Sequence, residues 1–96
     1  MTGVTVENSA VNRNTLAAIA WARRDLSPRE RSLITLSALT ALGKTQQLPW
    51  HIALGYQNGL SQAEIVELFT HLAFYAGWPA AASALTCLNE QETPCP

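Results

Sequence analysis

Charged residues are scarce in this sequence. Asp, Glu, Lys and Arg make up only 14% of the 96 residues, whereas an average soluble domain contains about 25%. Hydrophobic residues make up 48%, and a domain of this size buries only about two-thirds of the surface that its unfolded chain exposes. Because so few charges leave apolar surface uncovered, we expect the chain to form a homo-oligomer.

The sequence also lacks an excess of either charge. Six basic and seven acidic side chains give a net charge of −1, which provides no basic surface for a nucleic acid. The length is that of one domain and excludes a multidomain enzyme. We therefore expect a single domain over residues 1–96 that does not bind nucleic acid.

No segment has the features of a targeting signal or a membrane span. The first residues contain no basic start followed by an apolar run, so we expect a cytoplasmic protein. Residues 68–89 contain no Asp, Glu, Lys or Arg, but Gly77-Trp78-Pro79 interrupts them. We interpret this stretch as two short buried helices and expect no association with a membrane.

Cysteine is almost absent, and the familiar chemical motifs are missing. Cys87 and Cys95 match neither a CxxC redox motif nor a zinc site, so we interpret them as reduced, structurally minor thiols. The sequence contains no Ser-His-Asp arrangement, glycine-rich phosphate loop or metal-binding cluster. These absences predict a site without cofactor or metal, or no catalytic site at all.

Helix signals are present throughout. Ser27 with Glu30 and Ser61 with Glu64 form capping boxes, and Gly43 and Gly59 follow apolar runs as helix-ending residues. We predict an all-α domain of about five helices, at residues 13–24, 28–42, 48–58, 61–76 and 79–90. Residues 1–12 and 90–96 lack periodicity, so we expect loosely ordered ends.

The second and fourth predicted helices are unusually apolar. After Arg31 the second helix has no wide polar face, which predicts burial on several sides. The fourth carries its charges only in the first turn, at Glu64 and Glu67, so we expect its remaining surface to lie in the interior or in an interface.

His51 is the first catalytic candidate. It follows Pro49 and Trp50, where an aromatic neighbour and a restricted backbone favour a dry environment. Desolvation lowers the pKa of an imidazole and keeps it neutral at pH 7, so that it can exchange a proton with a substrate. The alternative is a core or interface histidine that bonds to a backbone carbonyl.

Further candidates could form a binding pocket. His71 and Tyr75 are four residues apart and share a helix face. Trp50 and Trp78, together with Tyr56 and Phe74, are possible pocket walls, although aromatic clusters also build cores. Arg31 is a candidate for binding a carboxylate, as are Arg23, Arg24, Arg29 and Lys44, and each of these side chains is equally consistent with a solvated charge.

The order of these motifs resembles the carboxymuconolactone decarboxylase family, within the alkylhydroperoxidase D-like superfamily. The resemblance covers about residues 26–85 and rests on runs such as Arg31-Ser32-Leu33-Ile34-Thr35, Leu48-Pro49-Trp50-His51 and Phe74-Tyr75-Ala76-Gly77-Trp78-Pro79. It implies an all-α fold, trimers or hexamers, and sites near subunit interfaces.

The superfamily includes two chemistries. Its peroxidase branch has the pattern E-x11-C-x2-C-x3-H, and alignment of that histidine with His51 puts Ser32, Lys44 and Gln47 at the other positions. Thiol peroxidase activity needs a thiolate, and the absence of cysteine at these positions argues against this chemistry. The resemblance thus leaves peroxidase activity as the least favoured alternative.

The decarboxylase branch implies a cofactor-free lyase in the catabolism of aromatic compounds. His51 would be catalytic, and Trp50, Arg31, His71, Tyr75 and Trp78 would bind a small carboxylated lactone or cyclic compound. The chain has Gln47 where these decarboxylases usually have Glu, and Ala76 where they usually have Cys. A non-catalytic ligand-binding or structural oligomer of the same fold is therefore the alternative.

Overall fold

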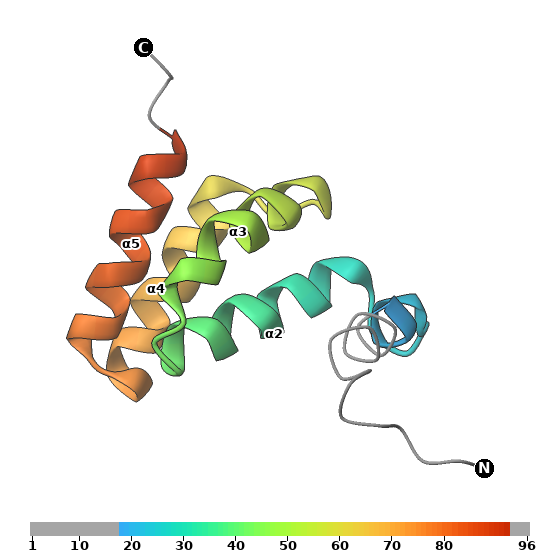
Figure 1. Cartoon of the computed structure of the whole chain (residues 1–96), viewed down its shortest axis with the longest axis horizontal. Coiled ribbons are helices and arrows are strands. Elements are labelled where there is room, and N and C mark those ends of the chain that lie inside the picture. The colour runs from blue at the N-terminus through green and yellow to red at the C-terminus, as the bar shows by residue number, and fades with distance from the viewer. Residues whose placement is uncertain (1–17, 93–96) are drawn as a thin grey trace, which may run out of the picture.

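The described part of the protein, residues 18–92 of a computed structural model, is helical (Figure 1). After helical residues 18–22, the elements are α2 (Pro28–Ala41), the 3-10 turn η2 (Thr45–Gln47), α3 (Leu48–Gln57), α4 (Gln62–Ala76) and α5 (Trp78–Glu92). No strand occurs in these residues. The all-α prediction is confirmed.

The helix bounds agree with the predicted ones to within two residues wherever the structure describes them. The first helix ends at residue 22 rather than 24, and its predicted residues 13–17 lie outside the described part. The expectation of a loose end from residue 90 is wrong for residues 90–92, which continue α5. Residues 1–12 and 93–96, where loose ends were also expected, are not described.

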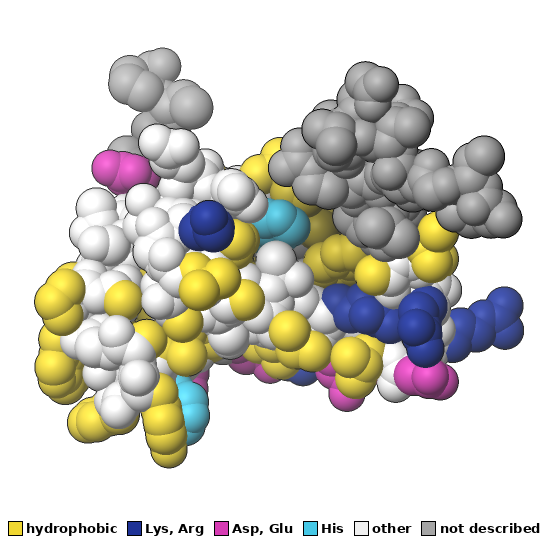
Figure 2. Space-filling view, turned by 60° about the horizontal axis from the view of Figure 1, so that its bottom comes forward, with side chains coloured by type: hydrophobic (Ala, Val, Ile, Leu, Met, Phe, Trp, Pro, Cys, Tyr) yellow, Lys and Arg dark blue, Asp and Glu magenta, His cyan; other side chains and the backbone are white. Residues whose placement is uncertain are grey.

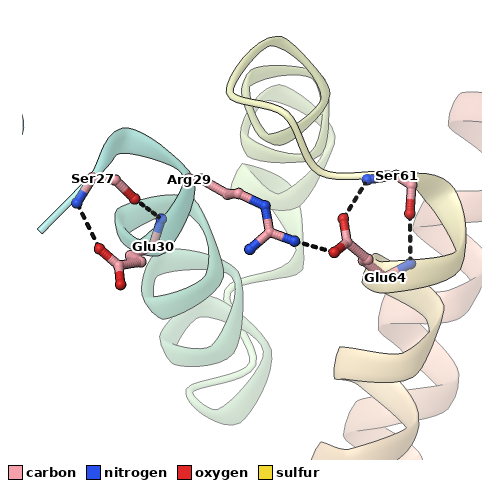
Figure 3. Close-up of polar contacts among 5 residues, drawn as sticks. All are labelled: Ser27, Arg29, Glu30, Ser61 and Glu64. Carbon is pink, nitrogen blue, oxygen red and sulfur yellow. Dashed lines mark hydrogen bonds and ion pairs between the residues drawn. The ribbon is translucent and has the colours of Figure 1, made fainter.

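Reciprocal capping boxes start α2 and α4, as the sequence predicts (Figure 3). The Ser27 N–H donates to Glu30 Oε1 at 2.7 Å, and the Glu30 N–H donates to Ser27 Oγ at 3.1 Å. The Ser61 N–H donates to Glu64 Oε1 at 2.9 Å, and the Glu64 N–H donates to Ser61 Oγ at 3.1 Å. Each box satisfies backbone donors that the first helical turn leaves unpaired.

Glycines end two of these helices in the left-handed region. Gly43 follows α2 with φ of 73°, and Gly77 separates α4 from α5 with φ of 103°. A side chain is strained at such values, so glycine permits the sharp turn. The break at Gly77 divides the charge-free stretch into two helices, and no helix among the described residues is long and apolar enough to cross a membrane.

One hydrophobic core joins the four long helices. Helix α4 packs along α5 and against α2, while α3 packs against α2 and α5. The core residues come from all of them and from the α3–α4 turn: Leu36, Leu39, Leu48, Ile52, Leu60, Ile65, Phe69, Ala84 and Leu88. Gly55 allows the α3–α4 turn to approach closely, because a Cβ there would lie 3.2 Å from the Leu60 side chain.

The predicted burial of α2 on several sides is wrong for the single chain. Ser32, Leu36, Leu39 and Thr40 are buried, but Ile34 is 53% exposed and Leu42 is 69% exposed. The neighbouring helices cover one face of α2 and leave the other open. The end of α4 is equally open, so these apolar surfaces are available for an interface.

Candidate functional site

The start of α3 is held firmly from two directions. Leu48 and Ile52 on its first turns are fully buried in the core. Gln91 Nε2 on α5 donates to the Pro49 carbonyl at 2.9 Å. Pro49 sits in the first turn, where its missing N–H is not needed for helix bonding. His51 is therefore carried by a rigid part of the fold.

His51 lies half-buried in this first turn. Its Nδ1 atom is buried and has no hydrogen-bond partner. The Trp50 ring meets the imidazole edge-on, with ring centroids 4.9 Å apart and planes at 82°. Burial lowers the pKa of His51 below its usual 6.5, in the direction that the sequence predicts. The imidazole is therefore neutral at pH 7, with one nitrogen unpaired.

Arg31 is engaged elsewhere in the chain. Its Nη2 atom donates to the Arg23 carbonyl at 3.4 Å, and its Nε is buried without a partner. Among the described residues, no hydrogen bond joins Arg31 to His51. The guanidinium has N–H donors without a partner, and its hydrogen bond to Arg23 holds the segment that precedes α2.

The remaining predicted binding residues lie on α4 and α5. His71 and Tyr75 face each other with ring centroids 4.9 Å apart, as their spacing predicts. Trp78 packs edge-on against Phe74, with centroids 5.4 Å apart. Tyr75 is 77% exposed, and Trp78 is 64% exposed. These side chains form an open aromatic surface rather than the walls of a closed pocket.

His71 also lines a groove of about 410 Å³ between α2 and α4, here termed the α2/α4 groove. Its lining residues are Leu33, Ser37, Glu64, Glu67, Leu68, His71 and Leu72, and His51 is not among them. The sequence analysis did not identify this groove. The three-to-four-residue spacing of positions 64, 67, 68, 71 and 72 indicates that they share one face of α4. The sequence does not indicate that α2 lies opposite this face, because that depends on the tertiary fold.

The six predicted site residues therefore fall into three groups. Trp50 and His51 lie at the start of α3, and Arg31 lies on α2 beside the segment before it. The other three lie around the end of α4. The two histidine patches visible in Figure 2 are correspondingly well separated. Within one described chain, no ring contact or hydrogen bond unites the three groups.

A family model decides the wider relationship of the chain. The model of the carboxymuconolactone decarboxylase family matches residues 8–90. The chain belongs to this family. The resemblance seen in the sequence motifs is thus confirmed.

Two curated relatives are decarboxylases. A 4-carboxymuconolactone decarboxylase of Acinetobacter baylyi is 37% identical over 70 residues, which cover 73% of this chain and 52% of the relative. A nitrosuccinic acid decarboxylase of Metarhizium robertsii is 32% identical over 65 residues, which cover 68% of this chain and 46% of the relative. The chain therefore spans about half the length of the curated relatives that it matches.

The positions that correspond to redox cysteines precede α3 in this family member. Lys44 and Gln47 line a polar hollow of about 290 Å³ together with Gly43, Thr45 and Gln46. Neither position carries a thiol. The corresponding glutamate position, Ser32, is buried, and its Oγ accepts from Asn58 Nδ2 at 3.0 Å. Ser32 therefore takes part in a structural hydrogen bond of this chain.

Cys87 is a free thiol with a structural contact. Its Sγ lies 3.9 Å from the Thr45 carbonyl. Burial, with a smaller contribution from the charge of Glu90, raises the pKa of the Cys87 thiol. The thiol therefore stays protonated at neutral pH, which fits the interpretation from the sequence. Cys95 lies outside the described residues.

No group of three metal-ligating side chains gathers within residues 18–92.

Proposed function

We propose that this chain is a cofactor-independent decarboxylase that acts on a small carboxylated lactone or cyclic compound from aromatic breakdown, with His51 as the acid–base group. The observation that carries the proposal is the half-buried imidazole with a lowered pKa and an unpaired Nδ1. Family membership and two decarboxylase relatives support the reaction class.

The reaction needs an electron acceptor in the substrate and a proton at carbon. The bond to the carboxylate breaks, CO₂ leaves, and the electron pair delocalises onto the lactone carbonyl as a dienolate. A proton from water passes through His51 to the carbon, which yields the enol-lactone, and the hydroxide left by the water combines with CO₂ as bicarbonate. Because burial lowers its pKa, the protonated imidazole is a stronger acid toward that carbon. An apolar site favours the loss of the carboxylate charge.

The proposal includes a cytoplasmic homo-oligomer of three or six copies. Trp50 is 67% exposed beside a half-buried His51, so one chain does not enclose a substrate there. A second subunit would complete the pocket and exclude water from it. Arg31, His71, Tyr75 and Trp78 remain candidates for binding the substrate carboxylates or ring across such an interface.

A ligand-binding or structural oligomer is the second candidate. One observation favours it: burial lowers the pKa of His51, and no charged side chain among residues 18–92 adds to that effect. Catalytic histidines are usually oriented by a second polar group. Gln47 and Ala76, where the family decarboxylases usually have Glu and Cys, point the same way.

Release of CO₂ by the purified protein tests the proposal directly. 4-Carboxymuconolactone and nitrosuccinic acid are suitable substrates because each has a group that can accept the electron pair left by CO₂. We expect turnover of 4-carboxymuconolactone, the lactone of the two, with nitrosuccinic acid as the acyclic comparison, and we expect His51→Ala to lower kcat by about 100-fold or more.

His71→Ala provides the matched comparison on the second histidine. Because His71 is a candidate for binding the substrate rather than for proton transfer, we expect this variant to leave kcat nearly unchanged and to raise KM by less than about tenfold, equivalent to about 1.4 kcal/mol. Turnover that His51→Ala leaves intact would refute the assignment of His51. Calorimetric binding of either compound without CO₂ release would favour the ligand-binding alternative.

A further inference from the structure

Helical residues 18–22 form an apolar segment that the chain does not bury. Every residue in it except Trp21 is exposed, and Ile19 is 54% exposed. In Figure 1 this segment, coloured blue, lies beyond the N-terminal end of α2 and away from α5. An uncovered apolar helix in a chain of few charges indicates a surface that another molecule covers.

The α2/α4 groove is a second uncovered apolar feature. Its floor comes from Leu33, Leu68 and Leu72, which are only half-buried. The Ser37 hydroxyl, the one hydroxyl in the lining, already donates to the Leu33 carbonyl at 2.8 Å. Glu64 and Glu67 add carboxylates to this lining. An apolar segment with a basic end suits such a groove.

Charge is divided unequally between the two parts of the described chain. Residues 18–44 contain five Lys or Arg and two Asp or Glu, which gives a net charge of +3. Residues 45–92 contain four Glu and no Lys or Arg, which gives −4. Figure 2 shows most of the visible Lys and Arg side chains gathered at one end of the molecule. The basic excess of residues 18–44 and the acidic excess of residues 45–92 favour a contact between unlike surfaces of two copies.

Two charges near these apolar features have no partner among residues 18–92. Arg23 lies 3.9 Å from Asp25, and Glu64 is paired with Arg29. In contrast, Arg24, the second residue after the apolar segment, and Glu67 in the groove form no ion pair or hydrogen bond with another described residue. Both side chains belong to exposed residues. One unpaired cation and one unpaired carboxylate thus remain for a contact between molecules.

We propose that helical residues 18–22 of one copy pack into the α2/α4 groove of a second copy, where Arg24 pairs with Glu67. The segment does not line its own groove, and its residues other than Trp21 stay exposed. Arg31 holds the chain just after the segment by donating to the Arg23 carbonyl. Such a contact joins two different surfaces, so repetition with a closing rotation yields a ring. The inference deepens the proposed self-association and does not depend on decarboxylation.

Charge reversal tests this contact through the mass of the assembly, measured by light scattering over a dilution series. Wild type is expected to exceed 10.4 kDa by a whole multiple. Arg24→Glu and Glu67→Arg are each expected to weaken assembly by about tenfold, equivalent to about 1.4 kcal/mol. The double variant, which exchanges the two charges, is expected to regain most of the wild-type assembly.

Lys44→Glu and Glu90→Arg make the same charge changes at exposed positions outside the contact and are expected to assemble like wild type. Ile19→Asp tests the apolar part and is expected to weaken assembly while circular dichroism shows an intact helical fold. A monomeric wild type would refute self-association altogether. An oligomer that resists Arg24→Glu and Glu67→Arg, or a double variant without recovery, would refute this contact alone and leave the proposed decarboxylation untouched.

Discussion

The two histidines of this protein occupy contrasting surroundings. His51 lies half-buried on a helix start whose neighbours, Leu48 and Ile52, are completely buried. His71 is exposed on the outer part of α4 and stacks on Tyr75, which is itself 77% exposed. One imidazole therefore belongs to the framework of the fold, and the other belongs to an open surface.

This difference suits the region of His51 to proton transfer and the region of His71 to association with another molecule. Proton transfer needs a group of fixed position and tuned pKa, and only a well-anchored, desolvated side chain provides both. An apolar surface that carries flexible charges needs neither, because a partner can complete it. The start of α3 meets the first requirement, and the α2/α4 groove with its acidic residues meets the second.

The largest effect expected from this comparison is on stability. Ile52→Ala removes a fully buried side chain and should lower the free energy of unfolding by about 2–5 kcal/mol. Tyr75→Ala removes an exposed ring and should change it by less than about 0.5 kcal/mol. Urea denaturation at one protein concentration, followed by circular dichroism, measures both values.

An equally large loss in Tyr75→Ala would break the comparison between the two regions. It would mean that the tyrosine is covered in the assembled protein, since stability then includes association. Repeating the denaturation at a tenfold lower concentration identifies this case. A dependence on concentration would assign the loss to a subunit contact rather than to the fold of one chain.

A smaller effect is expected at the start of α4, the helix that carries His71. Ser61→Ala removes the hydroxyl that accepts from the Glu64 N–H and should lower the free energy of unfolding by about 1 kcal/mol. Ser83→Ala, on an exposed position within α5, is the matched control and should be neutral. Thermal melts of the two variants provide the comparison. A neutral Ser61→Ala would show that the cap contributes nothing and that the whole of α4 is held by its core residues.

Local signals in the sequence predicted the framework because they act over a few residues. The boxes at Ser27 and Ser61 and the break at Gly77 set helix ends through bonds and torsions within one turn. The burial of His51 was also predictable, since Pro49 and Trp50 are its neighbours along the chain.

The grouping of the site residues was not predictable in the same way. Arg29 pairs with Glu64 across 35 residues, and the α2/α4 groove combines side chains from two helices whose relative placement only the packed core determines. The exposed faces of Ile34 and Leu42 show a further limit. An apolar pattern does not distinguish burial within one chain from burial against another copy.

The smallest expected effect is the dependence of stability on pH at His51. Burial lowers the pKa of His51 in the folded protein below 6.5. As the pH falls from the ordinary histidine pKa toward the lower pKa of the folded protein, the unfolded chain binds the proton first, so the free energy of unfolding decreases. The range from about pH 5.5 to about pH 7.5 covers roughly one unit on each side of the ordinary histidine pKa. Chemical denaturation across this range should show the decrease in wild type.

His51→Gln should flatten the slope of this pH dependence relative to wild type, because glutamine does not titrate. Wild type and His51→Gln keep the same carboxylates and the same His71, so the difference between their slopes isolates the contribution of His51. Glu30 and Glu64 affect stability only at a lower pH. Their capping bonds lower the pKa values of both carboxyl groups below 4.5, so the free energy of unfolding falls on their account only in more acidic solution. An identical slope in wild type and His51→Gln would mean that the imidazole is solvated in the assembled protein, which would remove the physical basis for its role in proton transfer.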